Sequence, residues 1–344
     1  MKKRHYSYLL SAVALSLFIV FFQGSRPGKE SFSFRDASIP VITCRMNDTL
    51  SRGCDAFLNR IDQDNPLKIY NFSYVSDSGY CNRLESLTDL AKATGDNDEI
   101  LLFVHGHYKS FTDAAISGLR IQNLYDIKVL AFSWPSMMNR SPGAKNYLFS
   151  KGNVEAGTAG FRDLLLLIRD FKVAQSFSGR EVKISLCLHS LGNYFLERMV
   201  NDTLLCDLPG DLFENIIINA AAVEQEGHSE WVDKLNIQKR IYITSNEKDF
   251  NLAGVRSFTD SGVQLGKHTE LPHSDKAVYV DFTDAVGFRF PTGATHNYFT
   301  GKMALKNRKI HQFFEDLFHG RSVNLKDEFT FREKGNGTGF MFLP

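Results

Sequence analysis

The sequence predicts an α/β fold in which helices cover both faces of a mostly parallel sheet. Several short runs are apolar from end to end, as in strands that are buried on both faces. Segments with helical spacing separate most of these runs, which is the order of elements in a parallel sheet. A chain of 344 residues with 43% hydrophobic content can also bury one large core.

The expected strands and helices alternate along the chain. Strands are expected at 68–75, 99–104, 127–132, 182–188, 214–220, 240–245 and 277–282. Helices are expected at 111–124, 154–171 and 194–201. The sequence contains no internal repeat, no P-loop and no dinucleotide-binding glycine pattern.

This pattern divides the chain into four parts. Residues 1–24 are expected to be a signal peptide or signal anchor, and residues 25–66 a loop-rich linker or cap. The α/β domain is expected to span residues 67–320. Residues 321–344, which include a glycine-rich stretch, are expected to form a mobile C-terminal extension.

The N-terminus has the features of an export signal. A basic cluster at residues 2–5 precedes the uncharged apolar run Tyr6–Phe22. The small residues Gly24 and Ser25 follow, but they form no AxA cleavage site, so both a cleaved signal and an uncleaved anchor remain open. We expect a periplasmic or secreted protein, or one anchored in a membrane through residues 6–22.

Five cysteines must be interpreted in that compartment: Cys44, Cys54, Cys81, Cys187 and Cys206. An exported protein can form disulfides, and Cys44 with Cys54 is the favoured pair, although the sequence does not fix the pairing. The spacing matches no zinc motif. Cys187 lies in an apolar strand and is expected to be a small core residue rather than a nucleophile.

The stretch Ile184–Asn193 indicates a nucleophile. An apolar strand stops at His189 and a helical pattern follows, which places Ser190 at a sharp strand-to-helix turn. Such an elbow usually has small residues two positions before and after the serine. Gly192 satisfies the second position, but Leu188 occupies the first. An ordinary β-to-α turn would show the same pattern, so other residues must decide.

An oxyanion site is expected where the strand at 99–104 ends. The turn His105-Gly106-His107-Tyr108 follows this strand directly. In such a turn the backbone N–H of His107, together with that of Leu191 after the serine, would bind a developing negative charge. The imidazole rings of His105 and His107 are expected to brace the turn rather than to react.

An acid and a histidine follow in the order that a serine triad on this fold requires. Asp249 comes shortly after the strand at 240–245, with Glu247 as the alternative acid. His296 lies in a loop after the strand at 277–282. The order Ser190, acid, His296 is that of the α/β-hydrolases. The segment Phe250–His273 is expected to form part of the substrate mouth.

At these residues the chain resembles an uncharacterised α/β-hydrolase family whose members carry an HGxxxSFxDA loop, a WPS motif and an HSMGN elbow. The matching residues are His105-Gly106, Ser110-Phe111, Asp113-Ala114, Trp134-Pro135-Ser136, His189-Ser190-Leu191-Gly192-Asn193 and His296-Asn297-Tyr298-Phe299. The resemblance covers about residues 99–299 and implies an α/β-hydrolase fold with a triad of Ser190, Asp249 and His296. It implies no particular substrate.

The sequence therefore predicts a serine hydrolase of esterase or lipase type that acts on a small-molecule or lipid ester and needs no cofactor or metal. Ser190 would attack the acyl carbon, His296 would accept its proton and Asp249 would orient the histidine. A non-catalytic scaffold on the same fold and an acyltransferase are the alternatives. The net charge of +1 offers no electrostatic case for nucleic acid.

Overall fold

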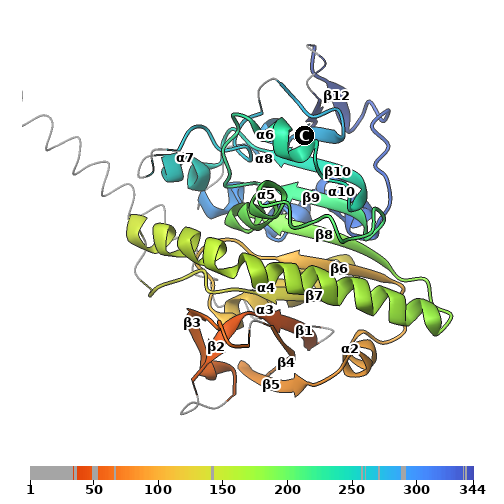
Figure 1. Cartoon of the computed structure of the whole chain (residues 1–344). Coiled ribbons are helices and arrows are strands. Elements are labelled where there is room, and N and C mark those ends of the chain that lie inside the picture. Colours follow the sequence, from red (N-terminus) through yellow and green to blue (C-terminus); the bar gives the residue numbers. More distant parts are fainter. Residues whose placement is uncertain are drawn as a thin grey trace, which may run out of the picture.

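The computed structural model contains one eleven-stranded sheet with helices on both faces (Figure 1). The structure describes residues 34, 37–48, 53–65, 67–140, 143–256, 259, 261–269, 272–287, 292–335, 337 and 339–344. Along the large sheet the strand order is β12-β13-β11-β10-β9-β8-β6-β7-β1-β4-β5, while β2 and β3 form a separate pair.

The strands are β1 (Ser38–Thr43), β2 (Arg45–Asn47), β3 (Phe57–Ile61), β4 (Lys68–Val75), β5 (Ser78–Leu84), β6 (Glu99–Val104), β7 (Lys128–Ser133), β8 (Lys183–His189), β9 (Phe213–Asn219), β10 (Gln238–Ser245), β11 (Ala277–Asp281), β12 (Phe331–Glu333) and β13 (Phe340–Phe342). The sheet is parallel from β13 to β1, and the pairs β1–β4, β4–β5 and β12–β13 are antiparallel. Each strand expected from the sequence is present, with ends that shift by at most two residues.

The helices are α2 (Leu87–Thr94), α3 (Phe111–Tyr125), α4 (Ala144–Phe177), α5 (Asn193–Asn201), α6 (His228–Val232), α7 (Phe250–Arg256), α8 (Thr283–Val286), α9 (Lys302–Lys306) and α10 (Arg308–Phe318), with short 3-10 turns η1 (Gly53–Ala56), η2 (Ser190–Gly192) and η3 (Thr292–Thr295). Helix α4 is ten residues longer at its start than the pattern predicts. Glycine and asparagine in its first turns weaken the local helical signal, but Tyr147 and Val154 are buried there and hold the helix to the sheet.

Two hydrophobic clusters lie on opposite faces of the sheet. Phe161 of α4 and Phe195 of α5 pack on one face, and Figure 1 shows α4 crossing in front of β6 and β7. Phe111 of α3 and Phe313 of α10 pack on the other face. Successive side chains of a strand point to opposite faces, so β6 supplies Leu102 to the first cluster and its neighbours in sequence to the second. The predicted α/β fold with helices on both faces is confirmed.

The segment expected to be a loop-rich linker contributes to the sheet. Strand β1 lies between β7 and β4, and its residues from Ile39 onward are fully buried. One feature hid it in the sequence: it contains Pro40, which argues against a strand inside a sheet. Proline lacks an N–H group, but Pro40 precedes the three residues that pair with β7, so the ladder tolerates it.

The expected Cys44–Cys54 disulfide was wrong: Cys54 pairs with Cys81 of β5, with a Cα–Cα distance of 5.6 Å. Cys44 is buried and free. Cys44 packs in the cluster on the α4 face, whereas Cys54 packs in the cluster on the α3 face. The sheet separates the two side chains, and short spacing in sequence could not reveal this.

The C-terminal extension also differs from the expectation of a mobile tail. Strands β12 and β13 form a hairpin, and β13 pairs in parallel with β11 at the edge of the sheet. Phe331 and Phe342 are buried and lie against Phe313 of α10. The alternating aromatics of this segment supply the burial that its glycine-rich turn lacks.

The apolar run at 6–22 lies outside the described residues. Among the residues that the structure does describe, no helix has the length and apolar character needed to cross a membrane.

Candidate active site

Ser190 occupies a strained turn between β8 and α5. Its φ is +53°, a left-handed value that non-glycine residues rarely adopt. The carbonyl of Ser190 accepts hydrogen bonds from the Ala222 amide at 3.1 Å and from Asn193 Nδ2 at 2.9 Å. Strain of this kind persists only where surrounding contacts impose it, and it concentrates at functional sites.

Two glycines allow the backbone to pass close to this turn. A Cβ atom on Gly192 would lie 2.7 Å from the carbonyl oxygen of His105. A Cβ atom on Gly106 would lie 2.7 Å from Ser190 Cβ and 3.0 Å from the carbonyl oxygen of His189. No real Cβ tolerates such distances, so the end of β6 and the turn after β8 require glycine at both positions.

Leu188, the departure from the usual small residue, is accommodated. Its side chain is fully buried in the cluster on the α4 face, together with Val104, Leu191 and Ile218. In the sheet it pairs with Val104 on one side and Ile218 on the other. Leu188 therefore does not prevent Ser190 from adopting its left-handed φ.

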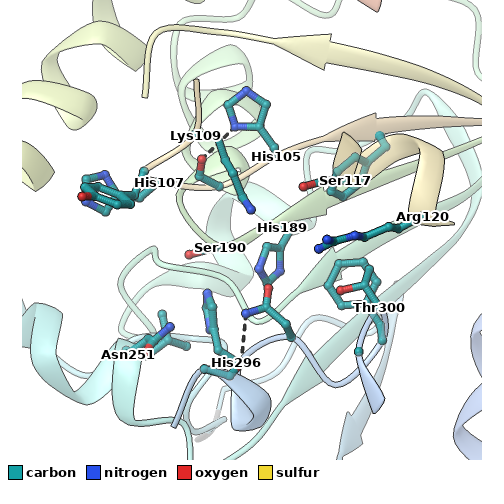
Figure 2. Close-up of a pocket in the computed structure, with 18 of the residues that line it drawn as sticks. His105, His107, Lys109, Ser117, Arg120, His189, Ser190, Asn251, His296 and Thr300 are labelled. Atoms are coloured by element: carbon teal, nitrogen blue, oxygen red, sulfur yellow. Dashed lines mark hydrogen bonds between the residues drawn. The ribbon is translucent and has the colours of Figure 1, made fainter. Parts of the chain in front are cut away.

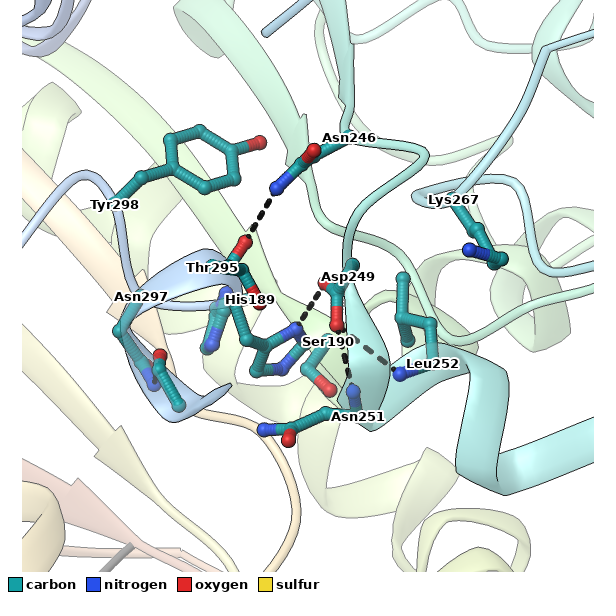
Figure 3. A network of polar contacts seen from close by, with 12 residues as sticks. His189, Ser190, Asn246, Asp249, Asn251, Leu252, Lys267, Thr295, Asn297 and Tyr298 are labelled. Carbon is teal, nitrogen blue, oxygen red and sulfur yellow. Dashed lines mark hydrogen bonds and ion pairs between the residues drawn. The ribbon is translucent and has the colours of Figure 1, made fainter. Parts of the chain in front are cut away.

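The structure brings His296 and Asp249 into direct contact. His296 Nδ1 lies 2.6 Å from Asp249 Oδ2, and the Asp249 carboxylate is fully buried. Its other oxygen, Oδ1, accepts the amide hydrogens of Asn251 at 3.0 Å and Leu252 at 3.1 Å at the start of α7 (Figure 3). Both carboxylate oxygens thus take part in hydrogen bonds, which fixes the orientation of the carboxylate.

The alternative acid points elsewhere. Glu247 is exposed, and its Oε1 lies 2.8 Å from Nδ1 of His268, which is not one of the candidate triad residues. Its position two residues before Asp249 places it on the outer side of the loop after β10.

Asn246 joins the loop that carries the acid to the loop that carries the histidine. Its Nδ2 donates to the carbonyl of Thr295 at 2.8 Å, and its own backbone carbonyl accepts from the Asp249 amide at 2.9 Å (Figure 3). Sequence reasoning missed this residue. The only signal was a polar side chain directly after a β-branched strand.

Ser190 and His296 line the same cavity, which has a volume of about 250 Å³ (Figure 2). The hydrogen bonds of the described residues include none between Ser190 Oγ and the His296 ring. Such bonds are often long in the free form of a hydrolase and tighten when substrate binds. Asn251, Leu252 and Val255 also line the cavity, so the start of the 250–273 segment forms part of its wall.

The His107 and Leu191 amides lie in the two turns that meet at Ser190. The His107 amide donates to no backbone carbonyl of the described residues, whereas the next amide, that of Tyr108, donates to Ser136 O at 2.7 Å. Leu191 is the second residue of η2, so its amide precedes the first hydrogen bond within that turn. This leaves both N–H groups available to a ligand.

The two histidine rings near the oxyanion turn make bracing contacts. His105 Nδ1 donates to Gly106 O at 2.8 Å, and His105 Nε2 accepts from the Trp134 amide at 3.1 Å. The ring also stacks on Trp134, whose Nε1 donates to His105 O at 2.8 Å. Burial holds the pKa of His105 well below its usual value, which agrees with a neutral ring that both donates and accepts.

His107 is fixed in a similar way. Its Nδ1 lies 2.9 Å from Ser150 Oγ, and that hydroxyl contacts the carbonyls of Ser136 and Asn146 at 2.7 and 2.8 Å. Because Ser150 can donate its single hydrogen to a carbonyl, His107 Nδ1–H is the donor in the first contact. Burial lowers the pKa of His107 to about 4. The WPS motif thus supports the turn through Trp134 and Ser136.

His189, next to the serine, was not assigned a role from the sequence. Its Nδ1 donates to Asn219 Oδ1 at 2.9 Å, and its ring centroid lies 4.6 Å from that of His296. Burial is the main cause of a pKa well below the usual value, and the neighbouring His296 acts in the same direction. His189 is therefore an uncharged side chain in the wall of the cavity, next to His296, the candidate base.

The parallel sheet, the strained serine turn and the order serine, aspartate, histidine define the α/β-hydrolase class. Residues 83–286, more than half of the chain, match the family described as alpha/beta hydrolase of unknown function (DUF900). The chain belongs to this family. No curated protein matches the chain.

Solved structures show distant similarity. An esterase from Pyrobaculum calidifontis is 11% identical over 74% of this chain and 81% of its own, with a TM-score of 0.35. Est1E from Butyrivibrio proteoclasticus is 10% identical over 74% and 96%, with a TM-score of 0.34. FphF from Staphylococcus aureus, a fluorophosphonate-binding serine hydrolase, is 12% identical over 80% and 97%, with a TM-score of 0.31. The family assignment rests on the match over residues 83–286.

Proposed function

We propose that this protein is a serine hydrolase that cleaves small carboxylic esters through Ser190, His296 and Asp249. The observation that carries the proposal is the 2.6 Å contact between His296 Nδ1 and the buried Asp249 carboxylate, beside a serine held at a left-handed φ in the same cavity. A catalytic triad needs a buried carboxylate to orient its histidine, whereas a non-catalytic scaffold has no need of such a pair.

The mechanism begins at the histidine. Because Nδ1–H donates to Asp249, the neutral ring of His296 keeps its lone pair on Nε2, which faces the cavity that contains Ser190. Nε2 accepts the Ser190 proton as Oγ attacks the acyl carbon. The imidazolium that forms is stabilised by the Asp249 carboxylate, and it then protonates the departing alcohol.

The tetrahedral intermediate places a negative charge on the former carbonyl oxygen. The N–H groups of His107 and Leu191 would donate to this oxygen, and donors of this kind contribute several kcal/mol because they are already oriented. Water activated by His296 then attacks the acyl-Ser190 ester, which releases the acid and regenerates the serine.

Active-site labelling tests this proposal. A fluorophosphonate probe is expected to modify Ser190 in the folded protein, and peptide mapping identifies the modified residue. Ser190→Ala should lose labelling and lose at least about a thousandfold in the turnover of aryl esters. Ser178→Ala removes an exposed serine at the end of α4 and is the matched control. A folded wild type that never labels and never turns over esters would favour a non-catalytic scaffold.

We also propose that the protein is exported, or held in a membrane, by its apolar N-terminal run at residues 6–22. The Cys54–Cys81 disulfide supports this, because such bonds persist mainly in oxidising compartments. Replacing both Leu15 and Phe18 with Asp should retain the precursor in the cytoplasm, since each charge in an inserting segment costs about 3 kcal/mol. Wild type found intact and freely soluble in the cytoplasm would contradict export.

A further inference from the structure

The cavity around Ser190 carries positive charge. Lys109 and Arg120 both line it, and among the described lining residues there is no aspartate or glutamate. Asp249 does not line the cavity. Its Oδ2 contacts the His296 ring, and its Oδ1 accepts from two amides at the start of α7. Figure 2 shows the charged ends of Lys109 and Arg120 pointing toward the space beside Ser190 and His189.

The backbone of Lys109 is held rigidly. Its amide donates to Ser136 Oγ at 2.9 Å, and its carbonyl accepts from Arg45 Nη2 at 2.8 Å. Ser110, the next residue, is the N-cap of α3 and forms a capping box with Asp113. The loop that supports the candidate oxyanion N–H group of His107 therefore also fixes the base of the lysine side chain.

Arg120 comes from a different element. It lies on α3, three residues after Ser117, so both side chains are on one face of that helix, and both line the cavity. A loop and a helix thus converge with one cation each. A cation on each of two rigid elements is an arrangement that fits a carboxylate or phosphate group.

Holding Lys109 here costs free energy. Burial lowers the pKa of its ammonium group, and the nearby Arg120 acts in the same direction. Asp113 opposes this effect more strongly than Arg120 adds to it, and its Oδ2 also accepts the Ser110 hydroxyl at 2.7 Å. Burial therefore disfavours the charge of Lys109, and an anion bound beside its ammonium group would favour that charge.

The rest of the lining limits the size of the ligand. Phe103 and Phe299 form an apolar wall, with ring centroids 6.2 Å apart, and Leu252 and Val255 contribute from the side of α7. A volume of about 250 Å³ lies below the usual range for sites that hold drug-sized ligands. The cavity suits a short carbon chain with a charged end better than a long acyl chain.

We propose that Lys109 and Arg120 bind an anionic group of the substrate, a carboxylate or a phosphate, so that the natural substrate is a short ester that carries a negative charge. The identity of this ligand as a substrate rests on the proposed hydrolase function. The anion site itself does not, because it can be measured by binding alone.

Matched esters test the proposal. Mono(4-nitrophenyl) glutarate and 4-nitrophenyl pentanoate have five-carbon acyl groups and differ in a terminal carboxylate. Wild type should favour the glutarate ester in kcat/KM, and the gain should appear mainly as a lower KM. Lys109→Met and Arg120→Gln should each reduce the preference about tenfold, the usual effect of losing one charge-assisted hydrogen bond. Lys183→Gln removes an exposed lysine at the far end of β8 and should leave it unchanged.

Direct binding separates this proposal from the hydrolase function. Calorimetric titration of Ser190→Ala with glutarate and with inorganic phosphate should show saturable binding that Lys109→Met on the same background weakens about tenfold. The tighter of the two ligands identifies the anionic group. Binding without labelling or turnover would overturn the hydrolase and leave the anion site. Labelling and turnover with equal rates on both esters and no binding would overturn the anion site alone.

Discussion

The backbone of Gly106 lies so close to Ser190 that a Cβ at residue 106 would fall 2.7 Å from Ser190 Cβ. The two residues come from turns after neighbouring parallel strands, β6 and β8, and the contact fixes the distance between the candidate oxyanion donor at His107 and the candidate nucleophile.

Gly106→Ala should therefore impair turnover more than folding. The added methyl group must push the two turns apart, and a displacement of about 1 Å at a catalytic site can cost about a hundredfold in rate. Ester turnover and the thermal midpoint are the measurements. Gly152→Ala is the matched control, because nothing lies within 4 Å of a Cβ at this position in α4. It should keep full turnover and gain about 0.5–1 kcal/mol of stability. Equal activity of Gly106→Ala and wild type would show that the turn adapts freely.

The acid can be identified by two amide substitutions. Asp249→Asn should lower kcat by about 10⁴-fold, because the amide can no longer support the imidazolium and can hold the ring in the wrong tautomer. Glu247→Gln should change turnover little, since Glu247 is exposed and contacts His268. Steady-state kinetics on one aryl ester decides between them, and circular dichroism checks that both variants fold. A large loss in Glu247→Gln with an active Asp249→Asn would reverse the assignment.

Acid should destabilise the fold through His107. Burial lowers its pKa to about 4, whereas histidine in an unfolded chain titrates near about 6.5. Between these values the unfolded chain binds a proton that the folded chain does not, so stability falls as the pH drops from about 6.5 to about 4. This group accounts for up to about 3 kcal/mol of that fall, and the lowered pKa values of His105 and His189 act in the same direction.

Urea unfolding at pH 7 and pH 4.5 measures this effect. His107→Gln should lose less stability between the two pH values than wild type loses. His268→Gln removes a more exposed histidine and serves as the control. An equal loss in wild type and His107→Gln would mean that His107 takes up its proton without unfolding.

The sequence predicts the long apolar strands of this fold well and its proline-containing or very short strands poorly. The strands β6, β8 and β9 are continuous apolar runs bounded by turns, so their burial is visible in the residues themselves. Strand β1 contains a proline, and β12 and β13 have only three residues each, which is too short to show a period. Their burial comes from distant partners, as does the position of Cys81 opposite Cys54.

The candidate site divides in the same way. Ser190, Asp249 and His296 each follow a strand or close a loop in a recognisable order, and this made them predictable. Lys109 and Arg120 carry no such signal, because a charged residue in a loop or on a helix is usually solvated. Only the folded chain places both cations on the cavity that Ser190 also lines.

Leu188 tests whether the unusual elbow limits catalysis. The side chain fills space between Val104 and Ile218 and packs in one cluster with Leu191, the next residue after Ser190. Leu188→Ala should lower the free energy of unfolding by about 2–5 kcal/mol, as for other buried leucines. Because the resulting cavity lies under the turn, turnover should fall as well. Leu186 lies two residues earlier in β8 and is equally buried. Leu186→Ala should therefore lower the free energy of unfolding by a similar amount but reduce the turnover rate less. Denaturant unfolding and ester kinetics on both variants provide the comparison. Higher turnover in Leu188→Ala would instead mean that the leucine displaces the Leu191 N–H from the oxyanion.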